Sequence, residues 1–166
     1  MNGLAFCLDR AVVFGAALAF LTATAFAQSN VPLVAHTAAH SVVVRDAWIR
    51  GTVDTQTATG GYMEITSREH SRLVSASSTA AGRVEFHEMR MEGNTMKMRA
   101  VETLTLPAGK TVRLSPGGYH LMLLDLKHAL QPGVAVPVTL VVEDSDGKRR
   151  MIEVTAEVRA LGGVTH

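Results

Sequence analysis

Cysteine, tyrosine, tryptophan and an excess of charge of either sign are all scarce in this sequence. Its 166 residues include one cysteine, one tryptophan and two tyrosines, and 16 basic side chains stand against 15 acidic ones. Because the net charge is close to zero, the composition argues against a nucleic-acid partner and by itself names no other. The length is sufficient for one ordinary domain with its own core.

Long apolar runs are also missing, apart from one stretch near the amino terminus. Residues 11–27 are mostly apolar, follow Arg10 and end with Ala25 and Ala27 in an A-x-A pattern. This stretch is short for a membrane span, and its pattern is typical of a cleaved signal peptide. We therefore predict that residues 1–27 are removed and that the protein is periplasmic, with no membrane span after cleavage. An uncleaved membrane anchor is the alternative.

The single cysteine lies inside the predicted signal. Cys7 precedes the main apolar run and is not followed by the features of a mature lipoprotein start, so we expect it to leave with the signal. The mature chain then has no thiol, which argues against a blue-copper electron-transfer site. Of the eight methionines only Met1 is lost. In an oxidising compartment, a soft-metal site in this chain would therefore be built from methionine and histidine.

Short β-type runs separated by turn residues fill most of the remaining sequence. Residues 28–40 show no clear period and are predicted to be a flexible leader. Nine strands are expected, over residues 41–49, 61–66, 73–77, 84–91, 95–101, 111–114, 119–124, 136–143 and 151–158. No amphipathic helix of convincing length appears, so the fold class is predicted to be all-β, a sandwich or barrel. One domain is expected over residues 41–162, with a short tail at 163–166.

Histidine and methionine recur at a distinctive spacing in the second half of the chain. His87, Met98, His120 and Met122 form the pattern H-x10-M-x21-H-x-M. Residues two apart in a strand point to the same face, so His87 shares a face with Met89, and His120 shares one with Met122. The spacing therefore suits ligands presented by neighbouring strands.

A tight turn in the middle of this pattern predicts which residues face each other. If Gly93 and Asn94 are the two loop residues of a hairpin, Met89 lies opposite Met98. Met98 is then diagonal to His87 on the same face, within reach of a long side chain. Gly93 occupies a position that tolerates positive φ.

Two imidazoles and two thioethers would suit one metal ion in particular. Thioethers are soft, neutral ligands that favour Cu(I), and imidazole coordinates well when unprotonated. If the strand at 119–124 lies beside the hairpin, His87, Met98, His120 and Met122 converge, and we predict that they bind one Cu(I). Met89 is an additional candidate ligand, although core or rim packing is favoured for Met89, Met91 and Met96.

The sequence also predicts positions for several residues near these candidate ligands. Glu85 shares the face of His87 and either orients its imidazole or is simply solvated, the second being favoured. Trp48 and Tyr62 are expected in the core. Phe86 and Leu121 are expected to anchor the ligand strands in the core, and surface positions are expected for His70 and His128.

At these residues the chain resembles the periplasmic PCuAC-type copper chaperones, whose H-x10-M-x21-H-x-M motif is matched here. Further similar segments cover about residues 42–158, and they are Asp46–Arg50, Val84–Met89, Met96–Arg99, Leu106–Gly109, Pro116–Leu123 and Val136–Leu140. The resemblance implies a cupredoxin-like β-sandwich that binds Cu(I). It also implies delivery of copper to an accepting protein, in the family typically a cytochrome oxidase subunit with its dinuclear copper centre, or an assembly factor.

This chain differs from many members of the family at its carboxyl terminus. Many relatives carry a tail rich in His and Met that is linked to Cu(II), whereas this chain ends with the lone His166. His36 and His40 in the leader, with the new amino terminus, are the other candidates for a weaker Cu(II) site, and solvated side chains are the favoured reading.

A monomeric, non-enzymatic metallochaperone is the function that these observations predict. No Ser-His-Asp or paired-carboxylate arrangement is visible in the sequence. Two alternatives stay open from the residues alone. One is a copper-dependent redox enzyme, which would need an open coordination position and a substrate pocket. The other is a structural or adhesive β-sandwich in which the methionines only pack.

Overall fold

The computed structural model describes residues 41–160, which form ten β-strands and no helix. The strands are β1 (Val42–Arg50), β2 (Ala58–Ser67), β3 (Ser71–Ser78), β4 (Ala81–Glu92), β5 (Thr95–Val101), β6 (Leu104–Leu106), β7 (Thr111–Leu114), β8 (Tyr119–Leu126), β9 (Ala135–Asp144) and β10 (Arg149–Arg159). No helix in this range is therefore available to cross a bilayer. The predicted signal, leader and tail lie outside the described residues.

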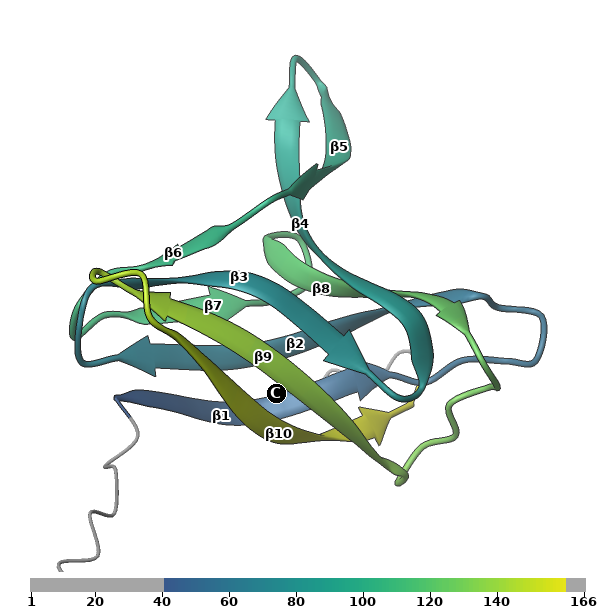
Figure 1. Cartoon of the computed structure of the whole chain (residues 1–166). Coiled ribbons are helices and arrows are strands. Elements are labelled where there is room, and N and C mark those ends of the chain that lie inside the picture. Colours follow the sequence, from purple (N-terminus) through teal and green to yellow (C-terminus); the bar gives the residue numbers. More distant parts are fainter. Residues whose placement is uncertain (1–40, 161–166) are drawn as a thin grey trace, which may run out of the picture. The chain divides into compact units, whose positions relative to one another are not determined.

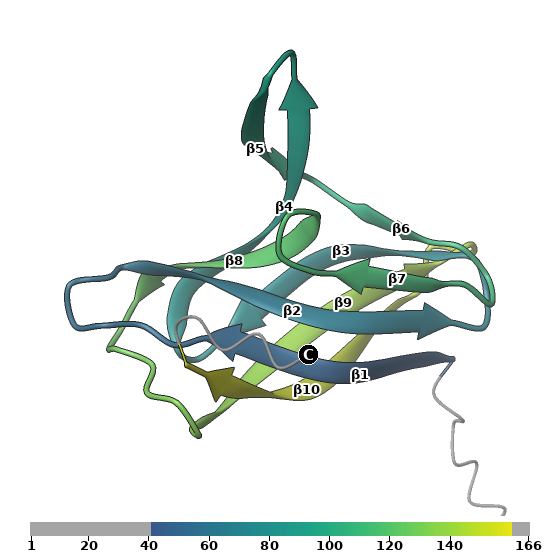
Figure 2. The ribbon, with the colours of Figure 1, turned by 180° about the vertical axis from the view of Figure 1, so that it is seen from behind.

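The strands pair into one sheet that closes on itself. Its order is β5-β4-β8-β7-β2-β1-β10-β9-β3-β6, and additional pairings join β4 to β3 and β8 to β2. Most neighbours are antiparallel, but β1 and β10 are parallel over Trp48–Arg50. In Figure 1 the strands β3 and β9 lie in front, and in Figure 2 the strands β2 and β7 do. The result is the predicted all-β, cupredoxin-like sandwich, with barrel-like closure.

The sequence pattern located nearly every strand. All nine predicted strands are present, β5 and β7 with the predicted bounds, while β6 was not predicted. Strand β6 has three residues and pairs with β3. Such a short strand offers too few residues to show an alternating pattern.

The core lies between the two sides of the closed sheet. Phe86, Leu121 and Leu123 are 5%, 0% and 0% exposed and point into it from β4 and β8. Mostly leucine, isoleucine and valine from the other strands, β1 and β6 among them, fill the rest. Since successive strand residues alternate between faces, burial of Phe86 and Leu121 fixes His87 and His120 on the outer face.

One irregularity overturns a prediction about Trp48. In β1, Asp46 has a φ of 47° and the register with β2 shifts between Arg45 and Trp48. This bulge reverses the alternation, because Val42 is buried before it and Ile49 is buried after it. Trp48 therefore points outward and is only partly buried, rather than lying in the core.

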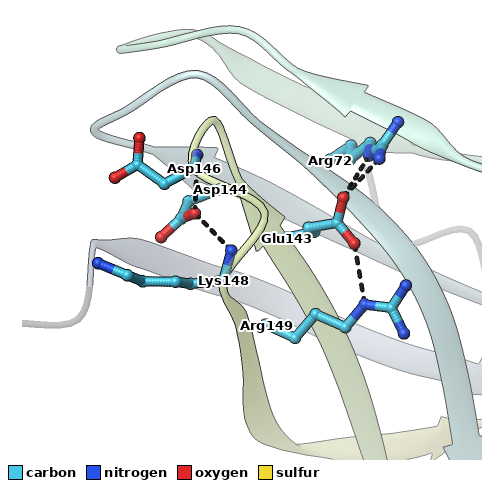
Figure 3. A network of polar contacts seen from close by, with 6 residues as sticks. All are labelled: Arg72, Glu143, Asp144, Asp146, Lys148 and Arg149. Carbon is cyan, nitrogen blue, oxygen red and sulfur yellow. Dashed lines mark hydrogen bonds and ion pairs between the residues drawn. The ribbon is translucent and has the colours of Figure 1, made fainter.

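Charged side chains join three strands at the loop between β9 and β10 (Figure 3). Glu143, which is 7% exposed, accepts hydrogen bonds from Arg72 of β3 and from Arg149 Nε of β10, the latter at 2.8 Å. These bonds hold the pKa of Glu143 below its usual value. Beside it, Asp144 Oδ1 accepts the backbone N–H groups of Asp146 and Lys148 and so fixes the turn.

Candidate metal centre

Strands β4, β5 and β8 bring the predicted ligands onto one outer face. His87 of β4 lies directly opposite His120 of β8, and Met89 of β4 lies directly opposite Met98 of β5. The hairpin register is the one predicted from the turn, and Gly93 has a φ of 63°. Opposite residues in an antiparallel pair share a face, so all four side chains project from the same side of the sheet.

The His120 imidazole is held so that one nitrogen faces a methionine sulfur. Its Nδ1 lies 3.1 Å from the carbonyl oxygen of Gly118, which can only accept, so Nδ1 carries the proton. In the neutral ring the lone pair is then on Nε2, and Nε2 lies 3.3 Å from Met98 Sδ. The imidazole nitrogen and the thioether sulfur both carry lone pairs, and no strong hydrogen bond occupies either of them. The two atoms are therefore close enough to bind the same metal ion.

The His87 imidazole likewise has one nitrogen that carries the proton and one that carries the lone pair. Its Nε2 lies 2.9 Å from Glu85 Oε2, and an ionised carboxylate can only accept, so Nε2 carries the proton. Nδ1 is buried and has no hydrogen-bond partner, alone among the buried side-chain nitrogens and oxygens of residues 41–160. A buried lone pair without a donor is costly. A bound cation would satisfy it, so the residues present fit a soft metal ion.

The two rings themselves are neighbours. The centroids of His87 and His120 are 5.8 Å apart with an interplanar angle of 47°. Both side chains are largely covered, His120 being 6% exposed. Imidazoles that orient through a carboxylate and a backbone carbonyl are typical of metal ligands. The sequence reading favoured a solvated Glu85, and the structure instead gives it this hydrogen-bonded role.

Met122 and Met89 approach the centre through the strand register. Met122 lies opposite Glu85 and two residues beyond His120, so it projects from the same face. Met89 is two residues beyond His87 on that face. The structure therefore brings the predicted ligand strands together, while the role of each side chain in binding stays a prediction.

Glycines in the loop before β8 shape the wall of the centre. Pro116 and Gly117 are the middle residues of a turn in which Gly118 N–H donates to Ser115 O at 3.0 Å, and Gly117 has a φ of 83°. This matches a type II turn. The carbonyl of Gly118 then accepts both His120 Nδ1–H and the backbone N–H of Met89 at 3.1 Å. The loop thus ties the ligand strand to the hairpin.

Two aromatic rings extend the row of imidazoles across β2 and β1. Tyr62 lies 6.4 Å from His120, and Trp48 lies 4.3 Å from Tyr62, centroid to centroid. Tyr62 is 6% exposed, yet it lies on the outer face beside His120, not in the interior core cluster. Its hydroxyl covers Gly60, where an added Cβ would be 2.5 Å from Tyr62 Oη. The bulge in β1 explains why Trp48 lies on this outer face, and Tyr62, opposite Trp48 in the register, shares that face.

Other titratable groups nearby lie on different faces. Tyr119, opposite Glu88 in the register, has its pKa raised by burial and by a hydrogen bond to the Glu88 carboxylate. His70 and His128 are exposed, as predicted. Within residues 41–160, no three His, Cys, Asp or Glu side chains gather as a metal-binding group.

Comparison with known proteins gives matches over most of the chain. The family model LpqE-like, described as "Putative lipoprotein LpqE-like", matches residues 42–158. A relative from Leifsonia xyli subsp. xyli, "Putative lipoprotein Lxx21020", is 33% identical over 141 residues, which cover 82% of this chain and 83% of the relative.

Solved structures of copper-binding domains share the fold. The Cu(I) form of DR1885 from Deinococcus radiodurans is 29% identical, with a TM-score of 0.56 over 74% of this chain and 83% of that one. The copper-bound PCuAC domain from PmoF2 is 23% identical, with a TM-score of 0.58 over 73% of this chain and 94% of that one. The sequence match and the shared fold together confirm the predicted resemblance, and the chain belongs to the LpqE-like family, with the fold of PCuAC copper-binding domains.

Proposed function

We propose that this protein is a copper metallochaperone that binds one Cu(I) through His87, Met98, His120 and Met122 and passes it to another protein. The observation that carries the proposal is the pair of neighbouring imidazoles. In each ring one nitrogen is hydrogen-bonded to an oxygen acceptor, and the other nitrogen keeps its lone pair for a metal ion. The thioether of Met98 at 3.3 Å from His120 Nε2 supplies the soft ligand that Cu(I) prefers.

The ligand set favours release as well as binding. Two imidazoles and two thioethers are neutral, so no ligand anion compensates the charge of the ion. An acceptor with anionic or more numerous ligands can then displace the protein's side chains by ligand exchange, with copper remaining Cu(I). Such a transfer needs no substrate pocket, and the proposed role is therefore non-enzymatic.

The acceptor and the compartment follow from the same proposal. We infer export to the periplasm, which the lipoprotein names of the family and of the Leifsonia relative support. A lipid anchor is not carried over, because Cys7 precedes the apolar run instead of following it. The proposed acceptor is a copper-accepting protein such as a cytochrome oxidase subunit or an assembly factor, served by a monomeric chaperone.

Anaerobic titration with Cu(I) against a chromophoric chelator tests the binding proposal. The full-length protein should carry Cys7→Ser so that the thiol of the signal segment does not compete. We expect one tightly bound Cu(I), and its loss in His120→Ala. The matched control is His128→Ala, because His128 is exposed and lies outside the centre.

The same titration can reject the proposal. Equal Cu(I) binding in His120→Ala and His128→Ala would remove His120 from the site. If the parent protein binds Cu(I) no more tightly than an unrelated protein that has no copper site, the result would instead favour a sandwich in which the methionines only pack.

A further inference from the structure

The β4–β5 hairpin continues well beyond the proposed copper centre. Figures 1 and 2 show it standing away from the rest of the sheet. Met91 lies opposite Met96, and Met89 lies opposite Met98, so four methionines share the face that carries His87. They form two cross-strand pairs between the copper centre and the turn.

The spacing of the two pairs suits stepwise movement of an ion. Opposite residues in an antiparallel pair have Cβ atoms about 4.5–5.5 Å apart, so two flexible thioethers can meet at one ion. Successive pairs on one face are about 7 Å apart along the strand. Met98 belongs to both groups, because it pairs with Met89 and its Sδ lies 3.3 Å from His120 Nε2.

Packing does not explain these methionines. Met91, Met96 and Met98 are 57%, 45% and 51% exposed. Methionine stabilises a fold by filling gaps in a core, and a hairpin that projects from the sheet offers no core to fill. Burial in the fold is therefore not the reason for apolar residues at these positions.

The opposite face of the same hairpin has a different composition. Glu92 accepts hydrogen bonds from Lys97 Nζ at 2.8 Å and from Arg99 Nη2 at 2.9 Å. Arg90 faces Lys97, and Glu88 faces Arg99. Charged groups thus occupy one face, and the thioether face has none between the copper centre and Met91.

We propose that Met91 and Met96 form a second, weaker Cu(I) site, the outer thioether site, through which the ion enters and leaves the His87–His120 centre. This inference rests on the proposed function and adds a route to it. The ion moves by exchange of one thioether for another, first Met91 and Met96, then Met89 and Met98, then the imidazoles. No electron is transferred, and copper is Cu(I) throughout.

A purely apolar docking patch for the acceptor is the competing explanation of the same surface. Leucine preserves the apolar area of methionine but has no sulfur. The double variant Met91→Leu/Met96→Leu therefore separates the two explanations. Met151→Leu is the matched control, because Met151 is 76% exposed on β10, away from the hairpin.

The experiment follows the ε-methyl NMR signals of methionine in the full-length Cys7→Ser protein during anaerobic Cu(I) addition. We expect the first equivalent to shift the Met98 and Met122 signals, and a second, weaker equivalent to shift those of Met91 and Met96. In Met91→Leu/Met96→Leu the second equivalent should be lost and the first retained, and transfer to a chelator should slow by about tenfold, equivalent to about 1.4 kcal/mol in the barrier. Met151→Leu should behave as the parent protein.

Different results overturn different proposals. If the first equivalent binds normally but the Met91 and Met96 signals never move, or if the double variant transfers copper as fast as Met151→Leu, the outer thioether site is wrong and the chaperone proposal stands. Failure of the first equivalent to bind in the parent protein would overturn the proposed function itself.

Discussion

At the scale of single residues, hydrogen bonds decide which nitrogen of each imidazole is free to bind a metal. Glu85 fixes the Nε2 proton of His87, and Gly118 fixes the Nδ1 proton of His120. The two histidines therefore present different nitrogens, Nδ1 and Nε2. Motif spacing names the histidines but says nothing about their tautomers.

Glu85→Ala should weaken Cu(I) binding without abolishing it. Loss of the carboxylate frees the His87 ring to rotate and to change tautomer, and loss of such an orienting partner typically lowers metal affinity by about 10- to 100-fold. Chelator competition measures the change. Glu153→Ala, at an exposed position on β10, is the control and should bind as the parent protein does. An affinity for Glu85→Ala equal to that of this control would show that Glu85 does not act through His87.

At the scale of strands, the site depends on the pairing of β8 with β4 and of β4 with β5. The hairpin turn places Met98 opposite Met89, and the pairing of β8 with β4 places His120 opposite His87. The first pairing is local in sequence and was predicted from Gly93 and Asn94. The second joins residues far apart in the chain, and only the closed sheet determines it.

The stability that Glu143 gives to the pairing of β3, β9 and β10 should depend on pH. Its pKa is lowered by hydrogen bonds from Arg72 and Arg149, so its stabilising contribution is complete above the ordinary value of 4.5 and is lost as pH falls through the lowered pKa. Glu143→Gln should therefore lower the melting temperature at pH 7, and the difference from the parent protein should shrink at acidic pH. Circular-dichroism melts from pH 7 to pH 3 measure this, and a difference that is independent of pH would contradict it.

At the scale of the whole molecule, the described domain carries the proposed copper ligands on strands whose other face is core. Phe86 and Leu121 anchor the residues next to both histidines, so the ligand backbones are rigid. The methionines of the hairpin, by contrast, lie on a projecting element. Largely buried imidazoles and exposed thioethers suit the proposed role, in which the protein both holds and releases an ion.

Export and processing can be tested on the intact protein in cells. We expect periplasmic material whose first residue is Gln28, because the A-x-A pattern precedes it. Mass spectrometry of the isolated protein should give the mass of residues 28–166 without added lipid. A species that retains residues 1–27, or that carries a lipid on Cys7, would contradict the predicted signal.

Local patterns were enough to predict nine of the ten strands of residues 41–160, the β4–β5 hairpin and the candidate ligand set. Alternation with period two, the Gly93–Asn94 turn and the histidine and methionine spacing are all properties of short segments. The comparison with PCuAC domains confirms the resemblance drawn from those segments and the fold it implied.

Only the tertiary structure decided how those segments meet. The bulge at Asp46 turned Trp48 outward, Tyr62 took a place beside His120, and Glu85 accepted a hydrogen bond from His87. These outcomes depend on strand pairings between distant parts of the chain and on one inserted residue, which reverses every side chain after it. For that physical reason, the sequence determined which side chains are available to bind copper, and the closed sheet determined which of their atoms face one another.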